Sequence, residues 1–101
     1  MAVNDKQKRY LRGLAHQLKP VVMIGNKGLT ETVLAEIHNA LDHHELIKVR
    51  VSGQEKAGRT EMMNEIADKT SSNLIMSIGH IGSFYRPAQE PTIQLPGKKA
   101  K

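Results

Sequence analysis

The chain has 101 residues, a formal net charge of +5 and no cysteine. This length predicts one domain with a modest core, and the lack of any long apolar run or apolar leader predicts neither a membrane span nor a secretory signal. The absence of cysteine excludes disulfides, thiolate catalysis and cysteine-bound zinc, and fits a cytoplasmic protein.

The positive charge is uneven along the chain. Residues 1–30 carry six basic residues and one acidic residue, whereas residues 31–70 carry five basic and eight acidic residues. The first third is therefore a positive region, whose natural partner is an anionic polymer such as a nucleic acid. A solvated basic surface without a ligand is the alternative.

Residues 4–18 are predicted to form the first helix. The helical spacing places five residues on its inner face: Gln7, Leu11, Leu14, Ala15 and Leu18. Asn4 or Asp5 can cap its start. Arg9 and Arg12 fall together on an adjoining flank, which is either an ordinary solvated side or a surface that contacts phosphates.

A strand, a glycine loop and a helix start follow. Residues 20–24 are an unbroken apolar run, which predicts a strand buried on both faces. The loop Gly25-Asn26-Lys27-Gly28 has two glycines that accept positive φ and a cation between them. Because the next helix begins at Thr30, the loop fits a phosphate contact at a helix N-terminus. A tight strand–helix turn without a ligand is the alternative.

The rest of the chain predicts two more helices and three more strands. Residues 30–42 form a helix, and residues 46–51 form a half-buried strand with Lys48 and Arg50 on one face. These two cations either contact phosphates or protect an edge strand from pairing. A helix from Glu55 or Thr60 to Thr70 leads to a hairpin of residues 73–78 and 81–85, and residues 92–95 are compatible with a short edge strand.

The resulting order, αβαβαββ, predicts a compact α/β domain with a mixed four-stranded sheet packed by helices. No nucleophile elbow or nucleotide P-loop is present, and no acid, base and nucleophile assemble, so we expect no enzyme activity and no cofactor. Histidines near the end of the second helix (His38, His43 and His44) lie beside Asp42 and Glu45. His38 and His43 are five residues apart, off the spacing that places two ligands on one helix face, so we expect no metal site.

These residues together carry a family resemblance. The runs that carry it are Leu11-Arg12-Gly13-Leu14-Ala15-His16, Pro20-Val21-Val22-Met23-Ile24-Gly25, Gly28-Leu29-Thr30-Glu31, His43-His44-Glu45-Leu46-Ile47-Lys48-Val49 and Tyr85-Arg86-Pro87. They resemble the CRM domain (chloroplast RNA splicing and ribosome maturation), in its free-standing bacterial form, the YhbY family.

The resemblance implies a fold similar to the C-terminal domain of translation initiation factor three. It also implies binding to ribosomal RNA in large-subunit precursors, with a loop that acts like that of KH domains. We expect the protein to be non-enzymatic, cytoplasmic and monomeric. The implied RNA-contacting residues are Gly25, Asn26, Lys27, Gly28, Arg9, Arg12, Lys19, Lys48, Arg50 and Arg86.

Two further expectations complete the prediction. Residues 1–96 form the domain, and residues 97–101 are a basic, disordered tail. The alternative function is a protein–protein adaptor that uses the acidic segment 31–70 or the tail, in which case the basic face is incidental.

Overall fold

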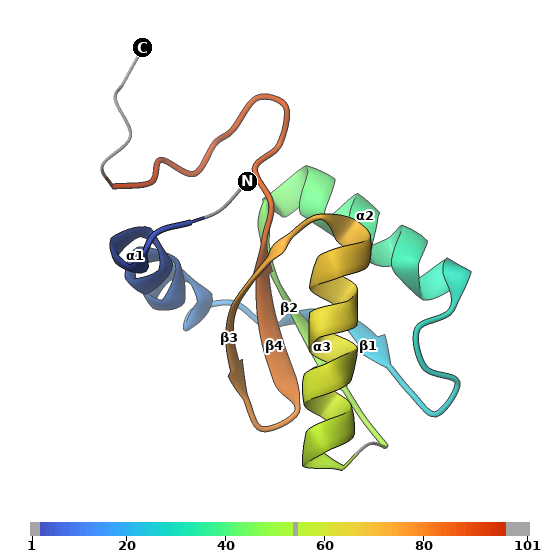
Figure 1. The fold of residues 1–101 in the computed structure, drawn as a ribbon. Coiled ribbons are helices and arrows are strands. Elements are labelled where there is room, and N and C mark those ends of the chain that lie inside the picture. Colours follow the sequence, from blue (N-terminus) through green and yellow to red (C-terminus); the bar gives the residue numbers. More distant parts are fainter. Residues whose placement is uncertain (1–2, 54, 97–101) are drawn as a thin grey trace.

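The computed structural model describes residues 3–53 and 55–96. A four-stranded sheet in the order β1-β2-β4-β3 separates one helix from two others (Figure 1). The elements are α1 (Asp5–Ala15), β1 (Pro20–Ile24), α2 (Glu31–His44), β2 (Leu46–Val51), α3 (Lys56–Thr70), β3 (Asn73–Ile78) and β4 (Ile81–Tyr85). β1 is parallel to β2, and β4 is antiparallel to β2 and β3, so the mixed sheet predicted from the sequence is confirmed.

The larger core lies between the sheet and the helices α2 and α3. Ile37 and Leu41 of α2 pack there with Met63 and Ile66 of α3. The inward strand residues are Val22, Ile24, Ile47, Val49, Val51 and Phe84. The strict alternation of β2 therefore predicted its buried face correctly, because side chains of a strand alternate between the faces of a sheet.

A smaller core lies on the other face of the sheet, beneath α1. Leu11 and Ala15 of α1 pack there against Leu46 and Tyr85, and Leu95 closes the cluster from the C-terminal segment. The capping expectation is confirmed in detail: the Asn4 side chain accepts from the Gln7 backbone N–H, and the Gln7 side chain accepts from the Asn4 N–H.

Helix bounds differ from the predicted ones at two places. α1 ends at Ala15 rather than at residue 18, and the chain turns through residues 16–19 before β1. After the helix, the Gln17 N–H donates to the Leu14 carbonyl and the Leu18 N–H donates to the Ala15 carbonyl. Pro20 then disfavours helical backbone at Lys19. α2 continues to His44, two residues beyond its predicted end, and stops where Glu45 adopts φ +66.

The prediction that β1 is buried on both faces is wrong. Val21 is 53% exposed and Met23 is 69% exposed. β1 is an edge strand, and α1 packs on β2, β3 and β4, so this end of the sheet lacks a helix on its second face. The apolar run at residues 20–24 therefore predicted the strand correctly, but it did not predict which of its side chains are buried.

The predicted edge strand at residues 92–95 is also absent from the described structure. Residues 87–96 instead follow the surface in an irregular path, with Leu95 buried and the Gln7 amide donating to the Pro96 carbonyl. The N–H groups of Thr92 and Ile93 donate to the Glu45 carboxylate, so they do not extend the sheet. The predicted tail, residues 97–101, lies outside the described residues.

Candidate nucleic-acid interface

The glycine loop at residues 25–28 has a fixed base and an exposed tip. The Gly28 N–H donates to the Gly25 carbonyl over 3.0 Å, and Gly28 has φ +74. Gly25, Asn26 and Lys27 are exposed. Within the loop only Gly28 uses the left-handed backbone that glycine favours. Lys27, the residue before it, is exposed at the turn.

The loop leads directly into α2. The Thr30 hydroxyl accepts from the Val33 N–H over 3.2 Å, which confirms Thr30 as the N-cap. Glu31 occupies the first turn, where the helix dipole favours an anion. The strand–loop–helix context expected from the sequence is therefore present.

Two other connections lie beside the glycine loop. The Ser52 N–H donates to the Ile24 carbonyl over 2.9 Å, and the Val51 N–H donates to the His80 carbonyl over 2.7 Å. The Asn26 side chain lies over Gly53, where a Cβ atom would come within 2.5 Å of Asn26 Oδ1. These connections lie at the same end of the sheet, which we call the loop end. It comprises residues 25–28, 52–53, 79–80 and the start of α3.

The loop end is rich in cationic side chains. Lys27 and Lys56 are exposed there, and Arg50 is exposed on β2 just before it. Arg59 Nε donates to the Gly79 carbonyl over 3.1 Å. Two acidic residues, Glu31 and Glu55, also lie at these helix starts. Sequence reasoning missed Lys56 and Arg59, because they belong to a segment whose net charge is negative.

The predicted basic residues do not form one compact group. Lys48 and Arg50 share the sheet face that α1 partly covers, and Arg50 lies beside Met23, two residues before the loop. Arg9 and Arg12 are exposed on α1, and Lys19 is exposed in the turn before β1. The loop end and β2 thus bring together the loop, Lys48 and Arg50, while the other cations lie on or after α1.

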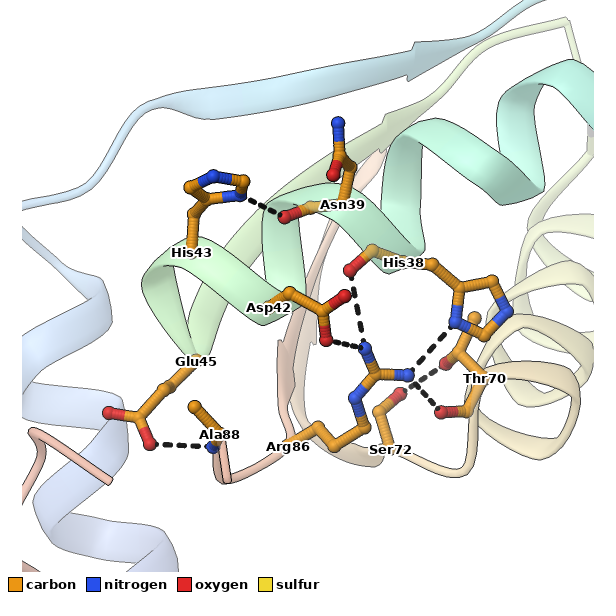
Figure 2. Close-up of polar contacts among 9 residues, drawn as sticks. All are labelled: His38, Asn39, Asp42, His43, Glu45, Thr70, Ser72, Arg86 and Ala88. Carbon is orange, nitrogen blue, oxygen red and sulfur yellow. Dashed lines mark hydrogen bonds and ion pairs between the residues drawn. The ribbon is translucent and has the colours of Figure 1, made fainter. Parts of the chain in front are cut away.

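Arg86 lies apart from these residues and makes contacts within the protein. Its Nη2 donates to Asp42 Oδ1 over 2.7 Å and to the His38 carbonyl over 3.2 Å. Its Nη1 donates to the Thr70 carbonyl over 2.9 Å and lies 2.9 Å from His38 Nδ1 (Figure 2). The guanidinium therefore joins α2 to the end of α3, and its donors are used within the protein.

The histidines at the end of α2 make local contacts. His43 Nδ1 lies 2.8 Å from the Asn39 carbonyl, and His38 contacts Arg86, as Figure 2 shows. No group of three or more potential metal ligands occurs among the residues that the structure describes. Within the same residues, no helix has the length and apolar character to cross a membrane.

Comparison with known proteins identifies the family. A profile of the CRS1/YhbY (CRM) domain matches residues 3–86, which is most of the chain. The chain belongs to the CRS1/YhbY (CRM) domain family. The resemblance seen in the sequence is thereby confirmed, and the glycine loop, β2 and Arg86 all lie inside the matched region.

Several proteins are similar to this chain over nearly its whole length. A Haemophilus influenzae protein named as RNA-binding is 53% identical over 96 residues, which span 95% of this chain and 97% of the relative. A Pseudomonas aeruginosa protein, named as a candidate RNA-binding protein, is 39% identical over 95 residues, or 94% of this chain and 91% of the relative. A Staphylococcus aureus protein, solved in solution and described as a candidate RNA-binding protein, has a TM-score of 0.82 and 35% identity, with 94% of this chain and 100% of that one covered.

Proposed function

We propose that this CRM-family chain is a non-enzymatic RNA-binding protein that acts in the cytoplasm on ribosomal RNA of large-subunit precursors. Relatives that match nearly end to end and are named for RNA binding support the choice of ligand. The observation that carries the site is the exposed tip of the glycine loop, with Lys27 at its centre and Arg50 on the neighbouring strand.

The proposed contact is chiefly to the RNA backbone. Exposed Lys27 and Arg50 and half-buried Lys48 supply positive charge, and the tip Gly25–Asn26 lets a phosphate approach the main chain closely. Arg9, Arg12 and Lys19 extend the positive surface along and beyond α1. We leave Arg86 out of this interface, because its guanidinium donors already bind His38, Asp42 and Thr70.

Charge reversal at the loop tests the proposal. Lys27→Asp should weaken binding to ribosomal RNA fragments and flatten the salt dependence between about 50 and about 200 mM, because fewer counterions are released. The matched control is Lys69→Asp, which changes the charge equally on an exposed turn of α3. Lys27 is exposed, so Lys27→Asp should melt close to the parent. Lys69→Asp loses the ion pair with Glu65 and places two carboxylates one turn apart, so it should melt slightly lower.

The control separates a specific site from general charge attraction. Equal weakening by the two variants, or unchanged binding by both, would remove the loop from the interface. A parent protein that does not bind ribosomal RNA would favour the adaptor alternative. Crosslinking in cell extract, followed by sequencing of the attached RNA, tests the ribosomal partner. Recovery of transfer or messenger RNA without ribosomal RNA would contradict that part of the proposal.

A further inference from the structure

Part of one sheet face is left without a helix. α1 covers the end of this face at Leu46 and Tyr85, whereas the opposite end lies open between α1 and the loop end (Figure 1). The strand register places Met23 beside Arg50, Arg50 beside Ile81, and Ile81 beside Ile78. These four residues form one row across all four strands, which we call the open row.

The open row is unusually apolar for a surface. Met23 is 69% exposed and Ile78 is 62% exposed, the highest values among the large hydrophobic residues of the described chain. The row spans three strand separations, or about 14 Å, since neighbouring strands lie ~4.8 Å apart. Met23 and Ile78 stand at the two ends of the row, with exposed Arg50 and half-buried Ile81 between them. Several exposed apolar side chains on one face mark a contact site more often than a single one does.

The charge of this face is all of one sign. The four strands contain no acidic residue, and their only charged residues are Lys48 and Arg50, both on the open face. Among the described residues, neither cation takes part in an ion pair. Lys48 stands in the next row, beside Ser83. The face therefore combines apolar contact area with unmatched positive charge, next to the glycine loop.

We infer that this open face is a platform for unpaired nucleotides of the bound RNA. The inference rests on the proposed RNA-binding function and specifies the form of RNA that it recognises. An unpaired nucleotide offers a flat apolar base face together with a phosphate, which matches Met23 and Ile78 together with Lys48 and Arg50. In a duplex the base faces are stacked inside the helix, so a duplex meets only the cations.

The chemistry of the platform sets its selectivity. It carries Met23, Ile78, Ile81 and the planar Arg50 guanidinium, which contact any base face without reading its hydrogen-bonding edge. Strand β1 passes directly from Met23 to the glycine loop, so one RNA strand can cross the platform and reach the loop. We expect preference for unpaired over paired RNA, with little preference among bases.

Removal of the apolar side chains without a change of charge tests this inference. The variant is Met23→Thr with Ile78→Thr, since threonine suits exposed strand positions. Its matched control is Leu14→Gln with Leu18→Gln, which removes two exposed leucines outside the sheet. Each full-length protein is titrated with labelled oligouridine and with a blunt RNA duplex, and its melting temperature is measured.

The expected result is a selective loss. The threonine variant should bind oligouridine about tenfold more weakly than the parent, because the apolar area that Met23 and Ile78 bury against the bases is lost. Its affinity for the duplex and the salt slope of its binding should remain those of the parent, because no cation has been removed. The glutamine control should bind both RNAs as the parent does.

Two results overturn the inference, and they are distinguishable. A parent protein that binds neither RNA contradicts the proposed function and the platform together. The second result needs a parent that binds RNA. If the folded threonine variant then keeps full affinity for oligouridine, or loses affinity for both RNAs equally, the platform is overturned and RNA binding remains.

Discussion

The carboxylate of Glu45 is bound by Thr92, a residue 47 positions further along the chain. Glu45 Oε1 accepts from the Thr92 hydroxyl over 2.7 Å and from the Thr92 N–H over 2.8 Å. It also accepts from the N–H of Ile93. Glu45 Oε2 accepts from the N–H of Ala88, as Figure 2 shows. Glu45 is 1% exposed, so one buried carboxylate fixes the path of the C-terminal segment.

Acid should loosen this attachment. Burial raises the pKa of Glu45, but the hydrogen bonds from Thr92, Ala88 and Ile93 lower it more, and the net pKa lies below its usual value of 4.5. Because the folded-state pKa is depressed, its contribution to stability is complete above pH 4.5 and is lost as the pH falls through the folded-state pKa. Urea unfolding at a series of pH values measures this loss.

The variant Glu45→Gln isolates the carboxylate. It should lower the free energy of unfolding at neutral pH by about 2 kcal/mol, since hydrogen bonds to a buried charge are replaced by weaker ones. Its stability should depend less on pH below 4.5 than that of the parent. Glu36→Gln, on the exposed side of α2, is the control. Identical pH profiles for parent and Glu45→Gln would refute this role of Glu45.

Arg86 should matter for stability rather than for RNA binding. Arg86→Lys keeps the charge but loses the planar fork that reaches Asp42, His38 and Thr70 together. We expect a loss of about 2 kcal/mol in the free energy of unfolding, with RNA affinity of the folded protein unchanged. Chemical denaturation and RNA titration measure the two effects. A stable variant with weakened RNA binding would return Arg86 to the interface.

The two glycines of the loop should respond differently to alanine. Gly28 has φ +74, so Gly28→Ala should cost about 1 kcal/mol of backbone strain. Space is not the reason, because a Cβ at Gly28 would lie 3.8 Å from the nearest atom, Met62 Cε. A Cβ at Gly25 meets no atom within 4 Å, and Gly25 has no positive φ, so Gly25→Ala should keep the stability of the parent. Thermal melts compare them, and equal destabilisation would contradict the described turn.

Core packing leaves no room for a side chain at Gly82, in the interior strand β4. A Cβ there would come within 3.0 Å of Met63 Sδ and within 3.0 Å of Phe84 Cε1. Gly82→Ala should therefore destabilise the protein by about 1–3 kcal/mol, as overpacking of a core does. Adding Met63→Ala should recover part of this loss, a coupling that a double-mutant cycle measures. Purely additive effects would place the strain elsewhere.

The candidate site was only partly predictable from the sequence. The loop at residues 25–28, its Thr30 cap and the outward position of Lys48 and Arg50 follow from local spacing. Arg86 was assigned to the basic face because an arginine at a strand end carries no local sign of its partners. Those partners, His38, Asp42 and Thr70, come from two helices that the sequence alone does not place together.

The order of helices and strands was determined by local periodicity, since apolar spacing and caps report on neighbours within one element. Sheet order was not, because pairing depends on residues far apart. The order β1-β2-β4-β3 made β1 an edge strand, exposed Met23 and Val21, and opened the face that we assign to unpaired RNA. The C-terminal segment likewise took its path from Glu45 rather than from its own sequence. Burial of a strand is decided by what covers it, and only the tertiary structure supplies that.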